Sequence, residues 1–125
     1  MAAPAPTRYR DFWPHYVGAH RRAGTRLLHF AGTSASLALL MIGLLLGPLW
    51  LLALAPVAGY GLAWLGHALV ERNRPAAFEH PLWGLIGDFQ MYGLMWAGRM
   101  DQEIIQLDLE GKLPFDVHSA ELNNW

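Results

Sequence analysis

Apolar residues fill the middle of the chain in one long stretch that carries no formal charge. Between Leu27 and Val70 there is no Asp, Glu, Lys or Arg. One helical crossing of a bilayer needs ~20 apolar residues, so the stretch is long enough for two. Gly47 and Pro48 lie near its middle, where a turn between two helices would fall. The pattern predicts a transmembrane hairpin with spans over residues 26–46 and 49–72.

Further helices are predicted on both sides of this hairpin. Before it, aromatic residues recur at helical spacing after Asp11, the expected N-cap, which indicates an amphipathic helix at the membrane interface that ends at Gly24. After it, residues 82–98 form a third apolar helix of about 17 residues, a marginal length for crossing. This helix either crosses with a tilt or packs against the hairpin without crossing. The fold class is therefore all-α, with a membrane-embedded helical domain over residues 1–100 and a polar, soluble tail over 101–125.

The composition supports membrane insertion and narrows the chemistry. Hydrophobic residues make up 54% of the chain and charged residues 15%, against roughly 45–50% and 25% in soluble domains. A net charge of −1 gives no indication of nucleic-acid binding, and the absence of cysteine excludes thiolate metal sites and a cysteine nucleophile. Every arginine lies before Leu27 or after Val70, away from the turn of the hairpin, so the positive-inside rule places both hairpin ends in the cytoplasm. We expect a multi-pass protein of a bacterial inner membrane.

Three histidines flank the hairpin in a pattern that favours a metal site. His29 lies near the start of the first span and His67 near the end of the second, so a closed hairpin brings both to one membrane face. His20 precedes His29 by nine residues, and a helix break at Gly24 would let the two side chains converge. Each histidine alone has a simpler structural interpretation. Together, at the cytoplasmic membrane face, they suit iron, zinc, copper or nickel.

Other ionisable residues near this face have more than one interpretation. Glu71 lies one helical turn after His67, where it would bind the same metal, orient the imidazole, or remain an ordinary solvated side chain. His80, in the following loop, is a weaker candidate ligand. Asp88 lies inside the third apolar helix, where it would reach the metal, pair with an arginine or hold a histidine ring. His15 and His118 are interpreted as surface residues.

Three segments resemble the motifs of a known enzyme family. The first is HRRAGTRLLHFAGT at residues 20–33; the second combines Gly66-His67, Glu71 and NRPA at 73–76; the third runs from PLW at 81–83 to GDF at 87–89. Over residues 12–99 the chain resembles the 2-hydroxy fatty acid dioxygenases of phytosphingosine α-oxidation and their small bacterial relatives. The resemblance implies an iron(II)-dependent membrane enzyme that uses dioxygen to shorten a long-chain 2-hydroxy fatty acid by one carbon.

On this interpretation the three histidines hold one Fe²⁺, and Glu71 and Asp88 are the candidate catalytic groups. The fatty acid enters from the bilayer, and its carboxylate pairs with one of three arginines at the same face, Arg26, Arg72 or Arg74. Two alternatives stay open. One is a zinc-dependent lipid hydrolase with Glu71 or Asp88 as general base, and the other is a non-catalytic membrane scaffold with structural histidines.

Overall fold

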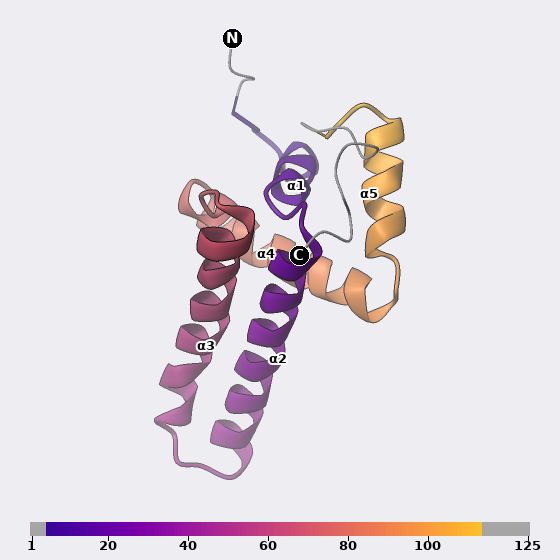
Figure 1. The fold of residues 1–125 in the computed structure, drawn as a ribbon. Coiled ribbons are helices and arrows are strands. Elements are labelled where there is room, and N and C mark those ends of the chain that lie inside the picture. The colour runs from indigo at the N-terminus through magenta and orange to yellow at the C-terminus, as the bar shows by residue number, and fades with distance from the viewer. Residues whose placement is uncertain (1–4, 114–125) are drawn as a thin grey trace.

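The computed structural model describes residues 5–113, and every regular element within that range is a helix (Figure 1). The elements are α1 (Tyr9–Gly18), α2 (Ala23–Leu45), α3 (Leu51–Leu65), a π-helical turn η1 (Gly66–Glu71), a short 3₁₀ turn η2 (Ala76–Phe78), α4 (Pro81–Trp96) and α5 (Met100–Leu109). The all-α fold class expected from the sequence is confirmed for these residues.

Helices α2 and α3 form the predicted hairpin and lie side by side, with η1 continuing α3 at the open end (Figure 1). The chain turns at Gly47, whose φ of 71° is in the left-handed region that glycine tolerates best. Both arms, Ala23–Leu45 and Leu51–Glu71, are long and apolar enough to cross a membrane. Only 17% and 22% of their apolar windows are buried inside the protein. A soluble core helix would be mostly buried, so this exposed apolar surface is typical of a hairpin that faces lipid.

Small residues let the two arms approach closely. A Cβ atom added at Gly32 would lie 2.9 Å from the carbonyl oxygen of Gly59, and the Ser36 hydroxyl donates a hydrogen bond to the carbonyl oxygen of Ala55. In a lipid environment the hydrophobic effect does not favour contact between apolar helices, and close packing of backbones at small residues drives their association instead.

Helix α4 runs across the open end of the hairpin at a steep angle to both arms (Figure 1). At 16 residues it is shorter than the two helices that qualify as spans. The Tyr92 ring packs against Phe30 of α2 at 4.8 Å, and its hydroxyl lies 2.9 Å from the Ser34 hydroxyl. Of the two placements open for the third apolar helix, packing against the hairpin without crossing fits these contacts.

A second packed region lies beside the hairpin, where α1, α4 and α5 meet. Phe12, Tyr16 and Val17 of α1 are buried there together with Met91 of α4 and Ile104 of α5. The polar tail predicted from residue 101 is therefore wrong over its first part, which is a packed helix. Residues 114–125, including His118, lie outside the described residues.

Candidate metal centre

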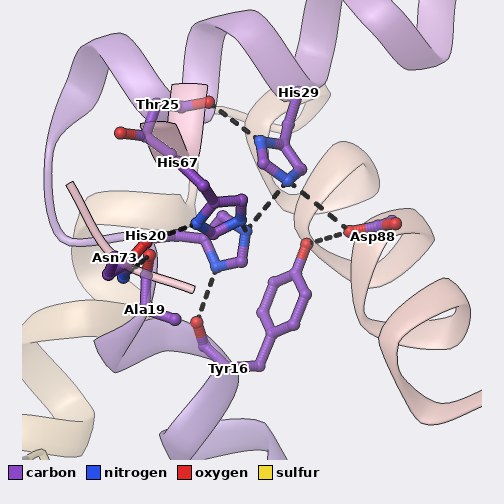
Figure 2. A network of polar contacts seen from close by, with 8 residues as sticks. All are labelled: Tyr16, Ala19, His20, Thr25, His29, His67, Asn73 and Asp88. Carbon is purple, nitrogen blue, oxygen red and sulfur yellow. Dashed lines mark hydrogen bonds and ion pairs between the residues drawn. The ribbon is translucent and has the colours of Figure 1, made fainter. Parts of the chain in front are cut away.

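Three histidine side chains from separate elements meet in the interior. His20 comes from the connection between α1 and α2, His29 from α2, and His67 from η1 (Figure 2). Each is at most 5% exposed. The Nε2 atom of His20 lies 3.0 Å from Nε2 of His29 and 3.1 Å from Nε2 of His67. We refer to these three residues as the histidine cluster.

The helix break that allows this convergence lies earlier than predicted. Helix α1 ends at Gly18, and α2 begins at Ala23 with Arg22 as its N-cap. Gly24 is therefore a buried residue inside α2, and its expected role as the break is wrong. The break falls on residues 19–22, which turn His20 back toward His29.

The start of α1 also differs from prediction. Arg8, not Asp11, is the N-cap, and it makes no capping hydrogen bond through its side chain. Asp11 lies in the first turn, where its carboxylate accepts a hydrogen bond of 3.1 Å from Nε of Arg8. The helix dipole favours a carboxylate in the first turn, so Asp11 still stabilises the start of α1, from inside the helix and not from the N-cap position.

Hydrogen bonds on the far side of the rings set the tautomers of two cluster residues. His20 Nδ1 lies 2.7 Å from the carbonyl oxygen of Tyr16, and His29 Nδ1 lies 3.0 Å from the carbonyl oxygen of Thr25. A carbonyl oxygen can only accept, so each Nδ1 must carry the proton. In a neutral imidazole the Nε2 atom is then an unprotonated lone pair.

His67 is fixed in the same way by a side chain. Its Nδ1 lies 2.6 Å from Oδ1 of Asn73, while Nδ2 of Asn73 donates a hydrogen bond of 2.9 Å to the carbonyl oxygen of Ala19 (Figure 2). The contact with Ala19 decides which end of the amide is oxygen. The His67 proton is therefore also on Nδ1, and its Nε2 faces the cluster as a lone pair.

This arrangement fits a bound cation. Burial lowers the pKa of His20 well below its usual value, and the two neighbouring imidazoles lower it further. A neutral cluster with its protons on the three Nδ1 atoms leaves no proton between the Nε2 atoms. The Nε2 lone pair of His20 lies about 3 Å from those of His29 and His67, and the lone pairs repel one another unless a positive ion lies among them. Ligand histidines in proteins are oriented through their second nitrogen in this manner. Among the described residues, this is the group of side chains whose ligand atoms lie close enough to share a metal.

Asp88 and Tyr16 lie directly beside the cluster. Oδ1 of Asp88 is 3.9 Å from Nε2 of His29 and accepts a hydrogen bond from the Tyr16 hydroxyl (Figure 2). The Tyr16 ring also stacks on the His20 ring at 4.1 Å. Burial raises the pKa of Asp88 to about 6, although the Tyr16 hydrogen bond opposes the shift. Burial and the nearby carboxylate raise the pKa of Tyr16, so it remains a proton donor.

The Glu71 carboxylate binds the chain connection before α2 and is not among the groups whose ligand atoms converge. Its Oε2 atom accepts hydrogen bonds of 2.7 Å from the Thr25 hydroxyl and 3.0 Å from the Arg22 amide, and Oε1 accepts one of 3.2 Å from the Arg21 amide. The N-cap residue of α2, Arg22, makes no capping hydrogen bond through its side chain, and the Glu71 carboxylate provides this capping from a distant part of the chain. This placement favours a structural function over the predicted metal or catalytic one.

The other candidate ligand, His80, lies in an aromatic group outside the cluster. Its ring stacks on Trp83 at 4.9 Å and meets Phe12 edge-on at 5.5 Å. Its contacts are those of a packing residue at the start of α4.

The three candidate arginines lie in different settings. Arg26 is 4% exposed, and its guanidinium donates to the carbonyl oxygens of His20 and Arg21 at 2.9 and 2.8 Å. Arg72 and Arg74 are exposed, and Arg74 lies over the Phe78 ring at 5.4 Å. Pairing between one of them and a substrate carboxylate stays a prediction.

Two cavities adjoin the histidine cluster. A small one of about 10 Å³ lies against all three rings, with room for roughly one small atom or ion. A larger one of about 340 Å³ runs between α2 and α3, from His29 to Leu40 and Ala55. Asp88 and His29 line both cavities, so the larger one begins where the histidine cluster lies.

Comparison with known families gives a clear result. The family model described as 2-hydroxy-palmitic acid dioxygenase Mpo1-like matches residues 7–100. The chain belongs to this family. The match includes α1 to α4 and every residue of the histidine cluster. No curated protein and no solved structure matches the chain.

Membership of this Mpo1-like family agrees with a metal-dependent dioxygenase in general terms, because the buried histidine cluster is suited to a metal ion.

Sequence reasoning missed two residues that shape the cluster, Asn73 and Tyr16. The signals were present, since Asn73 lies in the NRPA segment and Tyr16 precedes His20 by one helical turn.

Proposed function

We propose that this protein is an iron(II)-dependent dioxygenase that removes the carboxyl carbon of long-chain 2-hydroxy fatty acids. The observation that supports this most is the convergence of three Nε2 lone pairs at one end of an apolar cavity. The family to which the chain belongs supplies the reaction class. Neutral imidazoles with open positions beside them suit iron(II) and dioxygen.

The overall reaction balances without an added reductant if the lost carbon leaves as carbon dioxide. A 2-hydroxy acid and dioxygen then give the acid shortened by one carbon, carbon dioxide and water. The C1–C2 bond breaks, C2 becomes the new carboxyl carbon, and the four electrons lost by the two carbons reduce dioxygen. When bound, the iron supplies a centre at which the hydroxy acid and dioxygen meet.

The residues of this chain would position the groups and handle a proton. Hydrogen bonds at the three Nδ1 atoms hold the cluster rings in one orientation. The Asp88 carboxylate lines the cavity beside His29 and would accept the proton of the substrate 2-hydroxyl. Tyr16 fixes that carboxylate through its hydroxyl.

The setting suits an amphiphile. In our proposal the hairpin crosses the inner membrane of a bacterium, and the histidine cluster lies near its cytoplasmic face. The substrate head then reaches the cluster while its tail stays among apolar side chains. Short, water-soluble 2-hydroxy acids should be poor substrates, because each buried CH₂ contributes ~0.8 kcal/mol.

The test is metal analysis of anaerobically purified protein followed by an oxygen-uptake assay. We expect about one Fe²⁺ per chain, since the cluster offers a single set of imidazole ligands. With 2-hydroxypalmitate the enzyme should consume dioxygen and release the fifteen-carbon acid, whereas palmitate, which lacks the chelating hydroxyl, should be untouched. Iron-loaded protein that leaves 2-hydroxypalmitate unchanged would refute the proposal. Ester hydrolysis by zinc-loaded protein would then favour the lipid hydrolase, and a stable fold that binds no metal would favour the scaffold.

A further inference from the structure

The larger cavity has one polar end and one apolar end. His29 and Asp88 lie at the polar end, next to the histidine cluster, and Leu40 and Ala55 lie at the other. Leu85 and Phe89 of α4 line it from a third side. We refer to it as the interhelical groove.

The dimensions of the groove match a long acyl chain. His29 and Leu40 are both on α2, and a helix rises ~1.5 Å per residue, so the groove extends for about 16 Å. An extended chain advances ~1.2 Å per bond, because three backbone bonds span ~3.5 Å. A groove of about 16 Å therefore accommodates an acyl chain of about 13 bonds. The volume of about 340 Å³ is ample for such a chain, because a cavity needs only ~10–15 Å³ to hold one water-sized group.

We propose that the interhelical groove binds the hydrocarbon tail of the fatty acid and that its length sets the preferred chain length. The proposal rests on the proposed function for the identity of the head group. The tail runs from the cluster toward Leu40 and Ala55, along the hairpin, and Thr33 lies beside it one helical turn from His29. Thr33 is then a specificity-determining position.

Photo-crosslinking in the absence of oxygen tests where the tail lies without requiring turnover. The probe is 2-hydroxypalmitate with a diazirine near its last carbon, bound to iron-loaded protein in nanodiscs. We expect adducts on Leu40, Ala55 or Pro56, which line the far end of the groove. Excess unlabelled 2-hydroxypalmitate should suppress these adducts. A phosphatidylcholine with the same diazirine in its acyl chain should instead label lipid-facing residues such as Val57, which is 64% exposed.

Thr33→Phe tests the length dependence, with Met41→Phe as the matched control. Met41 is on the same helix, is 60% exposed and does not line the groove. A phenyl ring at Thr33 leaves ~6 Å of groove beyond His29, or about 5 bonds. We expect Thr33→Phe to lower far-end adducts about ten-fold, the effect of an overpacking penalty near 1.4 kcal/mol, and to move the turnover preference to acids about eight carbons shorter. Met41→Phe should behave like the unaltered protein.

The outcomes separate this proposal from the proposed function. Far-end adducts that 2-hydroxypalmitate suppresses support the groove even if no oxygen is consumed. Adducts spread over the lipid-facing surface overturn it, even if 2-hydroxypalmitate is turned over. An unchanged chain-length preference in Thr33→Phe that retains its iron and helix content also overturns it. If that variant does not fold, the adducts in the unaltered protein decide alone.

Discussion

Replacing Asn73 with alanine should weaken iron binding although Asn73 is not a ligand. The change removes the acceptor that lies 2.6 Å from Nδ1 of His67, and with it the reason for the proton to stay on that atom. It also removes the donor to the Ala19 carbonyl oxygen at 2.9 Å, which ties η1 to the connection beside His20. Loss of such a partner typically lowers metal affinity ~10–100-fold, which corresponds to about 1.4–2.7 kcal/mol.

The assay is competition for Fe²⁺ against a chromophoric chelator, carried out anaerobically on folded protein. Asn73→Asp is the matched variant, because its carboxylate still accepts from His67 Nδ1 but cannot donate to Ala19. We expect its iron affinity to stay within a few-fold of the unaltered protein, as a carboxylate is a common orienting partner of ligand histidines. The reasoning fails if the alanine variant binds iron normally, or if the aspartate variant loses as much affinity as the alanine variant.

Three further predictions follow from the same geometry. Changing any residue of the histidine cluster to alanine should remove most of the bound iron in metal analysis, whereas His15→Ala, at an exposed position, should retain it; retention in all three cluster variants would exclude the site. Glu71→Gln should lower the free energy of unfolding by ~1–3 kcal/mol, because it weakens hydrogen bonds from two amides and one hydroxyl, and an unchanged melting temperature would contradict the capping role. Gly32→Ala should lower the free energy of unfolding by ~1–3 kcal/mol, because the added methyl group meets the opposite backbone. Gly93→Ala, with open space around it, should leave the free energy of unfolding unchanged or raise it by up to ~1 kcal/mol. Equal melting temperatures for the two variants would argue against close packing of the hairpin arms.

The hairpin could be predicted from the sequence because its signal is long and simple. A charge-free stretch with a Gly-Pro pair in its middle allows few alternatives, and the observed arms differ from the predicted spans by one to three residues at each end. The meeting of His29 and His67 followed from this topology alone. Both lie near the open end of the hairpin, so no side-chain detail was needed.

Features set by particular side-chain contacts were harder to predict. The break before α2 was placed at Gly24 because glycine commonly ends helices, but the Glu71 carboxylate accepts hydrogen bonds from the preceding amides and α2 begins before Gly24. A cap from a residue so distant along the chain leaves no local signal. The same contacts hold the Glu71 carboxylate on the connection before α2, although its spacing from His67 suggested a shared site.

Helix α5 was missed for a different reason. Half of its ten residues are acidic or amide side chains, which led to the prediction of a soluble tail, yet Met100, Ile104 and Leu107 recur at helical spacing and are buried. Asp101 and Glu103 lie in its first turn, where acidic side chains favour a helix start. Periodicity was the better guide here, because a helix that covers one side of a core needs only one apolar stripe.

If the hairpin crosses a membrane as we propose, its separation from the packed region of α1, α4 and α5 means that two different solvents stabilise this protein. The packed region buries aromatic and aliphatic side chains such as Phe12 and Ile104 against one another and is held as a water-soluble domain is held. The hairpin leaves side chains such as Leu45 and Trp50 on its surface, and these gain nothing from folding unless lipid or detergent covers them. The histidine cluster lies where the two regions join, with His20 following α1 and the other two rings on the hairpin. Urea and delipidation would then act on opposite halves of the molecule, and either treatment would separate the three histidines of the cluster while the other half stays folded.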